Sequence, residues 1–241
     1  LLHFAWYLLS TSAVPLENYI ESGAVSILFR ALSSKDEHAR NIAYASLSEL
    51  YDLNMQKTDY TYHLQLQLLL ETLINAVTTK GMRFTSLITY FLTLASSIII
   101  KPSHTIFTTM IHFLASDKTL RVQSVPLFND LFGQNGLDFR NQRNWILKML
   151  KNGVNETADV ELMKKSRTIE KLCSFFASPL SEMKSRKLIL EILINASKYA
   201  KLDGIMIWAY SLMTEHFALP HIDQIVTLAL SIRSKDEVEK D

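Results

Sequence analysis

Long apolar segments with helical spacing constrain the fold of this 241-residue chain more than any other feature. Apolar residues recur three and four positions apart in windows far longer than a strand needs, as in the segment 35–53. This spacing places them on one face of a helix. The chain also has few helix breakers, with 6 Gly and 5 Pro, and 48% of its residues are hydrophobic. The sequence therefore predicts an all-α protein with a substantial core.

Helix boundaries can be placed from capping and breaking residues. Ser34 and Glu37 have capping-box spacing and predict the start of a helix over 35–53. The prolines fall near other predicted boundaries, where a missing N–H costs little. The remaining helices are predicted over 61–80, 84–100, 103–115, 126–133, 138–152, 158–177, 182–200, 203–216 and 220–232.

Three junctions resemble one another, and they end at Arg40, Arg121 and Arg186. Each consists of an apolar helix end, a turn that contains Ser, and an Arg in the next helix. We therefore expect an α-solenoid of degenerate HEAT/armadillo-like antiparallel helical hairpins. The alternative is a compact, irregular helical domain.

The expected organisation is a single helical-repeat domain over 1–232, followed by a charged tail over 233–241 that is predicted to be disordered. The chain begins with Leu1 rather than Met. We therefore expect a fragment of a longer protein.

No catalytic or cofactor-binding motif is found in the sequence. The seven histidines never form H-x-x-x-H or H-E-x-x-H spacing, and the six glycines form neither a phosphate loop nor a dinucleotide fingerprint. The single cysteine, Cys173, is expected to be a buried, inert thiol. We expect no enzymatic activity, no metal, no cofactor and no small-molecule substrate.

The uncharged segment 84–100 is the one candidate for a membrane span. It has 17 residues, at the short limit for a bilayer, and six of them are Ser or Thr. We expect a helix buried between other helices, and no membrane partner.

Charge is unevenly distributed although the chain carries only +1 overall. The net charge is −2 over 1–139, +7 over 140–201 and −4 over 202–241. A basic block of this kind fits binding to phosphates or to an acidic partner. It also fits a solvated helix face, and this simpler explanation remains open.

The helical wheel separates the cations of the predicted helix 138–152. Trp145, Ile146, Met149 and Leu150 form its core side. Arg143 lies beside that side and is expected to be structural, paired with a carboxylate such as Asp130 or Asp138. The predicted partner-binding or RNA-binding residues are the cations expected to face solvent here and in the next two clusters: Arg140, Lys148, Lys151, Lys164, Lys165, Arg167, Lys184, Arg186 and Lys187.

Three blocks of the sequence resemble a known family. The central block is V-P-L-F-N-D-L-F over 125–132, followed by D-F-R-N-Q-R-N-W-I-L-K-M-L-K-N-G over 138–153. The flanking blocks are L-S-S-K-D-E-H-A-R-N-I-A-Y-A-S-L over 32–47 and L-C-S-F-F-A-S-P-L-S-E-M-K-S-R-K-L-I-L-E-I-L over 172–193. Together they resemble the C-terminal region of the nucleolar pre-ribosomal-associated protein 1 family, over about residues 15 to 215.

The resemblance implies a nucleolar, non-enzymatic scaffold for early assembly of the large (60S) ribosomal subunit and for pre-rRNA processing. The partners that it implies are pre-60S particle proteins, including a DEAD-box helicase complex, together with pre-rRNA. The central block departs from the family's pattern at Lys151-Asn152-Gly153-Val154, where the local surface is more basic.

An alternative function is a cytosolic armadillo-type adaptor that binds an extended peptide in a groove. Such grooves carry Asn and Trp at equivalent positions of successive repeats. Trp6, Trp145 and Trp208 occupy dissimilar contexts, and this ranks the adaptor lower.

Overall fold

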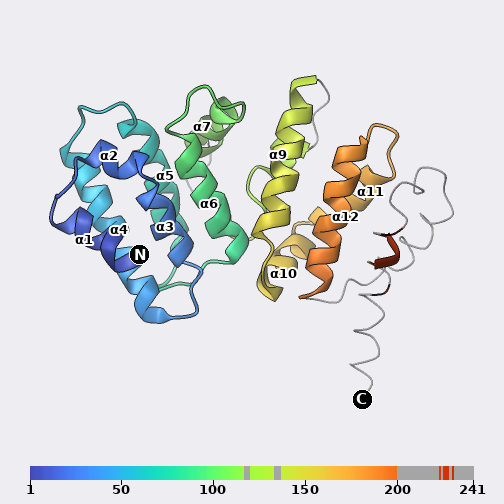
Figure 1. Cartoon of the computed structure of the whole chain (residues 1–241), viewed down its shortest axis with the longest axis horizontal. Coiled ribbons are helices and arrows are strands. Elements are labelled where there is room, and N and C mark those ends of the chain that lie inside the picture. The colour runs from blue at the N-terminus through green and yellow to red at the C-terminus, as the bar shows by residue number, and fades with distance from the viewer. Residues whose placement is uncertain (117–119, 133–136, 200–222, 224, 228–229, 231–241) are drawn as a thin grey trace, which may run out of the picture. The chain divides into compact units, whose positions relative to one another are not determined.

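The computed structural model describes residues 1–241 except 117–119, 133–136, 200–222, 224, 228–229 and 231–241 (Figure 1). The described residues form helices joined by turns and contain no strand, so the all-α prediction is confirmed. The helices are α1 (Leu2–Ser10), α2 (Leu16–Glu21), α3 (Ala24–Ala31), α4 (Glu37–Gln56), α5 (His63–Ala76), α6 (Ser86–Ile98), α7 (Phe107–Ser116), α8 (Phe128–Phe132), α9 (Leu137–Gly153), α10 (Thr157–Lys165), α11 (Thr168–Phe176) and α12 (Met183–Ser197).

The chain forms two compact units, Leu1–Val122 and Gln123–Asp241, which we call unit 1 and unit 2. The helix predicted over 203–216 and the predicted tail over 233–241 lie outside the described residues. Within the helix predicted over 220–232, Asp223, residues 225–227 and Leu230 are helical. The single repeat domain over 1–232 stays a prediction.

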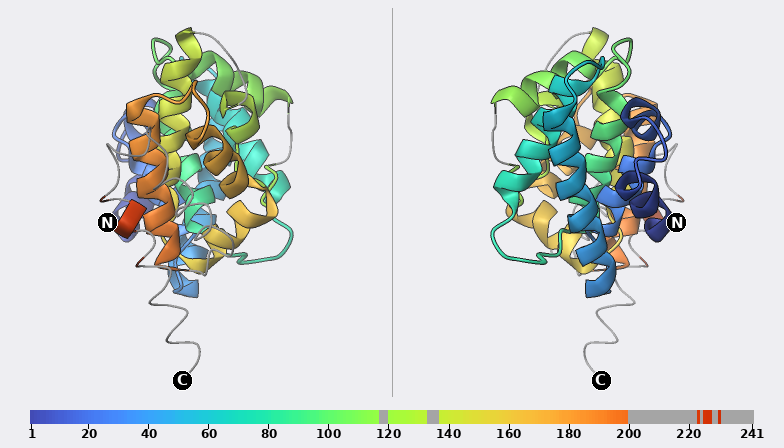
Figure 2. Two further views of the ribbon diagram at one scale, coloured as in Figure 1. Left: turned by 90° about the vertical axis from the view of Figure 1, so that its right-hand side faces the viewer. Right: turned by 90° about the vertical axis from the view of Figure 1, so that its left-hand side faces the viewer.

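Unit 1 is organised around the antiparallel pair α3 and α6. Ser26 near the start of α3 shares a hydrogen bond of 3.0 Å with Ser96 near the end of α6, and Arg30 donates to the Ser86 carbonyl at the other end (3.2 Å). Phe91 of α6 is fully buried and meets Phe113 of α7 edge-on, with ring centroids 5.8 Å apart. A second pair, α4 and α5, packs alongside (Figure 2, right).

The apolar segment over 84–100 forms α6, a buried helix of 13 residues. In the described part of the chain, no helix is long and apolar enough to cross a membrane.

The N-terminus of α4 differs from the capping box expected at Ser34. The helix begins at Glu37, and the Asp36 side chain accepts a hydrogen bond from the His38 amide (3.0 Å). Ser34 closes the preceding turn instead, because its hydroxyl accepts from the Asp36 amide (3.2 Å). Asp36 competes successfully for the capping position because an aspartate accepts backbone N–H bonds at least as well as a serine.

Two of the three similar junctions close in the same way. Arg40 donates to the Ser34 carbonyl (3.0 Å) in unit 1, and Arg186 donates to the Ser178 carbonyl (3.4 Å) in unit 2. Each arginine thus reaches back from the start of its helix to the serine-containing turn before it. The shared pattern of the sequence corresponds to a shared local structure.

Unit 2 contains the parallel pair α9 and α12, which lie side by side (Figure 2, left). Ile146, Met149 and Leu150 of α9 are buried and Trp145 is half-buried, as the wheel predicts. Helices α10 and α11 connect the two members of the pair along the chain.

The prediction of one helix over 158–177 is wrong. The segment forms α10 and α11, separated at Ser166 and Arg167. Arg167 adopts a left-handed conformation (φ 53°, ψ 28°), which ends a right-handed helix. No glycine or proline marks this break, so the sequence carries no conventional signal for it.

Candidate partner-binding surface

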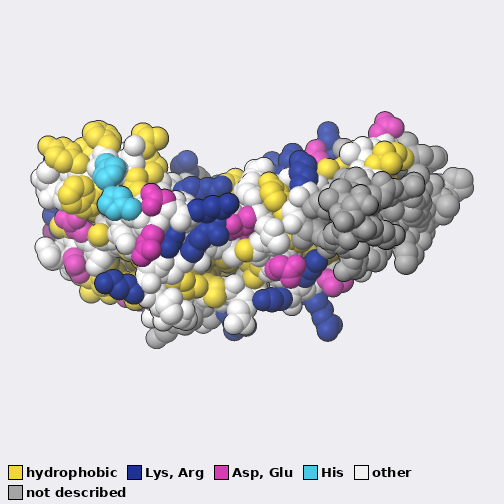
Figure 3. Space-filling model, turned by 90° about the horizontal axis from the view of Figure 1, so that it is seen from below, with side chains coloured by type: hydrophobic (Ala, Val, Ile, Leu, Met, Phe, Trp, Pro, Cys, Tyr) yellow, Lys and Arg dark blue, Asp and Glu magenta, His cyan; other side chains and the backbone are white. Residues whose placement is uncertain are grey.

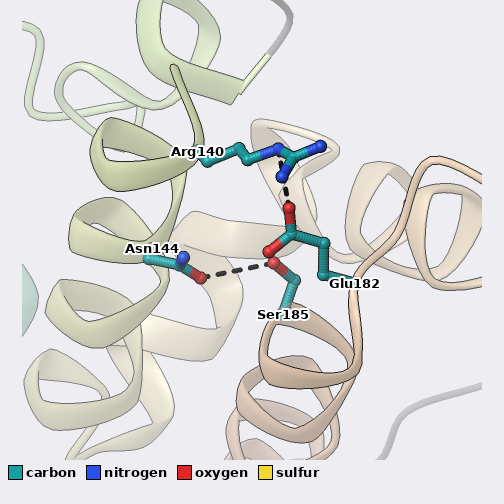
Figure 4. Close-up of polar contacts among 4 residues, drawn as sticks. All are labelled: Arg140, Asn144, Glu182 and Ser185. Atoms are coloured by element: carbon teal, nitrogen blue, oxygen red, sulfur yellow. Dashed lines mark hydrogen bonds and ion pairs between the residues drawn. The ribbon is translucent and has the colours of Figure 1, made fainter. Parts of the chain in front are cut away.

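The cations of α9 lie on a face that is partly turned toward α12. The Arg140 Nε lies 2.7 Å from Glu182 Oε1, just before α12 begins (Figure 4). One turn along α9, the Asn144 side chain contacts the Ser185 hydroxyl at 3.3 Å. Arg140 is therefore an exposed residue whose charge is locally compensated by a carboxylate.

Lys151 is engaged in a similar way at the far end of the same helix pair. Its Nζ lies 2.8 Å from Glu191 Oε2 of α12. The Asn195 side chain donates to the carbonyls of Lys151 (3.3 Å) and Val154 (2.8 Å), so it caps the C-terminal end of α9. Both contacts tie Lys151 to α12.

The other predicted cations are differently placed. Lys164 forms an ion pair with Glu161 within α10 (3.4 Å), and Arg186 is half-buried against its turn. The exposed remainder, without a carboxylate partner among the described residues, are Lys148, Lys165, Arg167, Lys184 and Lys187. The structure thus separates cations already engaged within unit 2 from cations that are open to a partner.

On the face shown in Figure 3, magenta groups lie beside some of the dark blue groups, and other dark blue groups lie together. Local compensation lowers the field that a charge count alone would suggest. Because Arg140, Lys151 and Lys164 are paired with carboxylates, the +7 block overstates the basic surface available to a ligand.

Arg143 is buried, as expected for a structural arginine. Its guanidinium carbon lies 4.5 Å from the centroid of the Phe175 ring. Burial lowers the pKa of Arg143, Glu182 opposes that shift, and Arg140 adds to it. The pairing with Asp130 stays a prediction, and the Asp138 side chain lies outside the described ones.

A groove between α8 and α11, which we call the aromatic groove, was not predicted from the sequence. Its volume is about 710 Å³, and its lining residues are Phe128, Asn129, Phe132, Arg167, Glu170, Lys171, Ser174 and Phe175. The i,i+4 spacing of Phe128 and Phe132 was the available signal. The groove brings Arg167, a predicted site residue, beside three phenylalanines.

The rings of the aromatic groove are arranged in a fixed order. Phe128 stacks on Phe132, with ring centroids 4.7 Å apart and 19° between the ring planes. Phe132 forms a T-shaped contact with Phe175, with centroids 5.1 Å apart and 69° between the planes. Phe128 is buried, whereas Phe132 and Phe175 are half-buried. The groove therefore exposes part of the Phe132 ring and part of the Phe175 ring to solvent, and both rings are packed against other aromatic rings.

Cys173 is half-buried in α11. Burial raises the pKa of its thiol to about 12, with the Glu170 carboxylate contributing in the same direction. Because the thiolate is the reactive form, this thiol is a poor nucleophile at neutral pH.

The described residues contain no cluster of three or more His, Cys, Asp or Glu side chains able to hold a metal ion. The described surface of unit 2 presents exposed cations and a groove lined by phenylalanines. Fold and surface together define a helical protein with features suited to binding macromolecules.

The sequence comparison identifies the family. Residues 25–215 match the family described as nucleolar pre-ribosomal-associated protein 1, and the chain belongs to this family. The match agrees with the resemblance carried by the three sequence blocks. The family is described as nucleolar, in agreement with the expected nucleolar localisation.

Two curated relatives carry the same description. The human nucleolar pre-ribosomal-associated protein 1 is 30% identical over 201 residues, and the mouse protein is 27% identical over the same length. The aligned region covers 83% of this chain and 9% of each relative. No solved structure matches the chain.

Proposed function

We propose that this chain is a non-catalytic scaffold segment in ribosome biogenesis. It acts in early nucleolar assembly of the large (60S) subunit and in pre-rRNA processing. The observation that carries the proposal is membership of a family named for its association with pre-ribosomes, over 25–215. That name describes an association and not a reaction, which supports a non-catalytic role.

The proposed ligands are proteins of the pre-60S particle, including a DEAD-box helicase complex, with pre-rRNA as a second ligand. They bind the surface of unit 2 through the basic region over 140–187. The five exposed cations without a described carboxylate partner, Lys148, Lys165, Arg167, Lys184 and Lys187, supply the charge. Arg140, Lys151 and Lys164 contribute less, because a carboxylate already lies beside each.

The fold that supports this scaffold is a degenerate α-solenoid. The similar closure of the turns by Arg40 and Arg186 supports a repeated unit. So does the parallel pairing of α9 with α12, whose contacting residues are about 41 positions apart, as in Asn144 and Ser185. HEAT and armadillo repeats have periods of about 40–47 residues.

The armadillo-type cytosolic adaptor is not favoured. A nucleolar family fits a pre-ribosomal role better than a cytosolic one. In addition, the Asn144 and Asn195 side chains are engaged between α9 and α12, so they are not presented as a peptide-binding series.

The test is co-sedimentation of the tagged protein with pre-ribosomal particles after charge reversal. Lys148, Lys165, Lys184 and Lys187 are changed together to Glu, and we expect the particle-bound fraction to fall roughly tenfold or more, because several favourable charge contacts become repulsive. The matched control reverses four exposed lysines of unit 1, namely Lys35, Lys57, Lys80 and Lys101. Equal losses in both variants, or none in either, would contradict the proposed surface.

A further inference from the structure

The aromatic groove of unit 2 combines an aromatic lining with cations. Among the described residues that line it, the apolar ones are Phe128, Phe132 and Phe175, and none is aliphatic. The charged ones among these described residues are Arg167, Lys171 and Glu170. The volume of about 710 Å³ falls within the range of ligand sites, roughly 300–1,000 Å³.

The phenylalanines are positioned by contacts outside the groove. Phe128 supports Phe132 from the buried side, and the Arg143 guanidinium lies over Phe175 at 4.5 Å. Rings held in this way lose little conformational freedom when a ligand stacks on them. The surface is therefore preorganised for flat, aromatic ligands.

Of the two cations, Lys171 is held by a side-chain contact and Arg167 is set by its backbone position. The Lys171 ammonium is 2.5 Å from the Asn129 side-chain oxygen across the groove. Arg167 is exposed at the turn between α10 and α11, in a left-handed conformation that suits Gly and Asn better than Arg. A residue held in a costly backbone conformation points to a role for its side chain.

We propose that the aromatic groove binds single-stranded RNA, with an unpaired base stacked on the exposed part of the Phe132–Phe175 pair and the backbone phosphates next to Arg167 and Lys171. Stacking platforms beside cations are the general means of binding single strands, because every base has a flat face and every nucleotide a phosphate. The inference rests on the proposed function, which supplies RNA as the ligand. It adds where the RNA binds and that the bound RNA is single-stranded.

A peptide is the competing occupant, and the lining argues against it. The apolar groove between α4 and α5 in unit 1 has the features that suit protein side chains, with five aliphatic residues and no charge: Leu47, Leu70, Leu73, Ile74 and Val77, with Tyr44, Ser48 and Tyr51. The aromatic groove shares none of its aliphatic character. An acidic peptide that contains aromatic residues is therefore the control ligand.

The experiment measures binding of the intact chain to a fluorescent 12-nucleotide single-stranded RNA by anisotropy. A second probe of the same length keeps the ribose-phosphate backbone and lacks the bases. Phe132→Ala should weaken binding to the RNA by roughly 5- to 100-fold, the loss expected for one stacked base, and should change binding to the abasic probe by less than about twofold. Phe4→Ala, which removes an exposed aromatic ring of unit 1, is the matched control and should change neither.

Arg167→Asn tests the phosphate contact without disturbing the turn, since Asn tolerates the left-handed conformation. It should weaken both probes alike and reduce the salt dependence of binding by about one counterion. Circular dichroism checks the helical content of each variant. If Phe132→Ala fails to fold, the loss of RNA binding is measured with Arg167→Asn and Lys171→Gln, which both lie at exposed positions.

The proposal is overturned if the chain does not bind the RNA. It is also overturned if Phe132→Ala weakens both probes equally, or if the acidic aromatic peptide binds at least as tightly and displaces the RNA. These outcomes leave the proposed function standing if charge reversal still releases the protein from pre-ribosomes. Conversely, if charge reversal of the four lysines leaves co-sedimentation with pre-ribosomes unchanged, the proposed binding surface is rejected. This holds whatever the aromatic groove binds.

Discussion

The helix pair α3–α6 of unit 1 and the pair α9–α12 of unit 2 are held together by different interactions. The first is joined by buried apolar side chains and by hydrogen bonds such as Ser26 to Ser96 and Arg30 to the Ser86 carbonyl. The second has a buried core too, but two ion pairs lie along its rim, Arg140–Glu182 and Lys151–Glu191. A basic helix face can therefore serve its own fold, so that charge alone does not identify a binding site.

Removal of a buried ring should have the largest effect on unit 1. Phe91→Ala leaves a cavity between α6 and α7, beside Phe113, and we expect it to lower the free energy of unfolding by about 3–5 kcal/mol. Urea denaturation followed by circular dichroism measures the change. The control, Phe4→Ala at a site that is 61% exposed, should cost less than about 1 kcal/mol. Similar losses in the two variants would show that burial does not distinguish these sites.

The single cysteine provides a probe that lies in unit 2 alone. Since the pKa of Cys173 is raised to about 12, its thiolate is scarcer at pH 8 in the folded chain than in the unfolded chain, and alkylation should be at least ~100-fold slower. Phe176→Ala, in the core of unit 2, should accelerate labelling, whereas Phe91→Ala should not. Acceleration by Phe91→Ala would show that the two units do not open independently, because unit 1 would then control the opening of unit 2.

Loss of one amide should weaken the α9–α12 pair at its end. Asn195→Ala leaves the carbonyls of Lys151 and Val154 without that donor and should cost about 1–2 kcal/mol in urea denaturation. Asn41→Ala, at an exposed position of α4, is the control and should stay within about 0.5 kcal/mol. A cost equal to the control would mean that the amide does not contribute to the end of α9.

The smallest effect should come from the ion pair that distinguishes unit 2. Arg140 and Glu182 are 59% and 38% exposed, so a double-mutant cycle should give a coupling of only about 0.2–1 kcal/mol. In about 1 M salt this coupling should vanish, because the Debye length is only ~3 Å. The neutral pair Ser26–Ser96 should couple equally at both salt concentrations. A salt-independent Arg140–Glu182 coupling would contradict the electrostatic interpretation.

Helices with one continuous apolar face were predictable from the sequence. The predicted helix 138–152 is α9, within one residue at each end, because amphipathic spacing and Gly153 both mark it. The division of the segment 158–177 into α10 and α11 could not be predicted. This interruption depends on the backbone conformation of Arg167, and arginine ordinarily continues a helix.

The candidate site was predictable only in part, for a physical reason. A helical wheel reports the direction of a side chain relative to its own helix, and it correctly separates Arg143 from Lys148. It does not report the neighbouring helix, so Glu182 and Glu191 could not be assigned to Arg140 and Lys151. The aromatic groove has the same origin, since Phe132 and Phe175 meet only when α8 and α11 pack together.

The left-handed backbone of Arg167 has a consequence for laboratory evolution. Glycine adopts this conformation without a steric penalty, so a library selected for heat resistance alone should accumulate Gly at position 167. A library selected for ligand capture should retain a cation there. The residue recovered at this one codon therefore reports which of the two pressures acts on the turn.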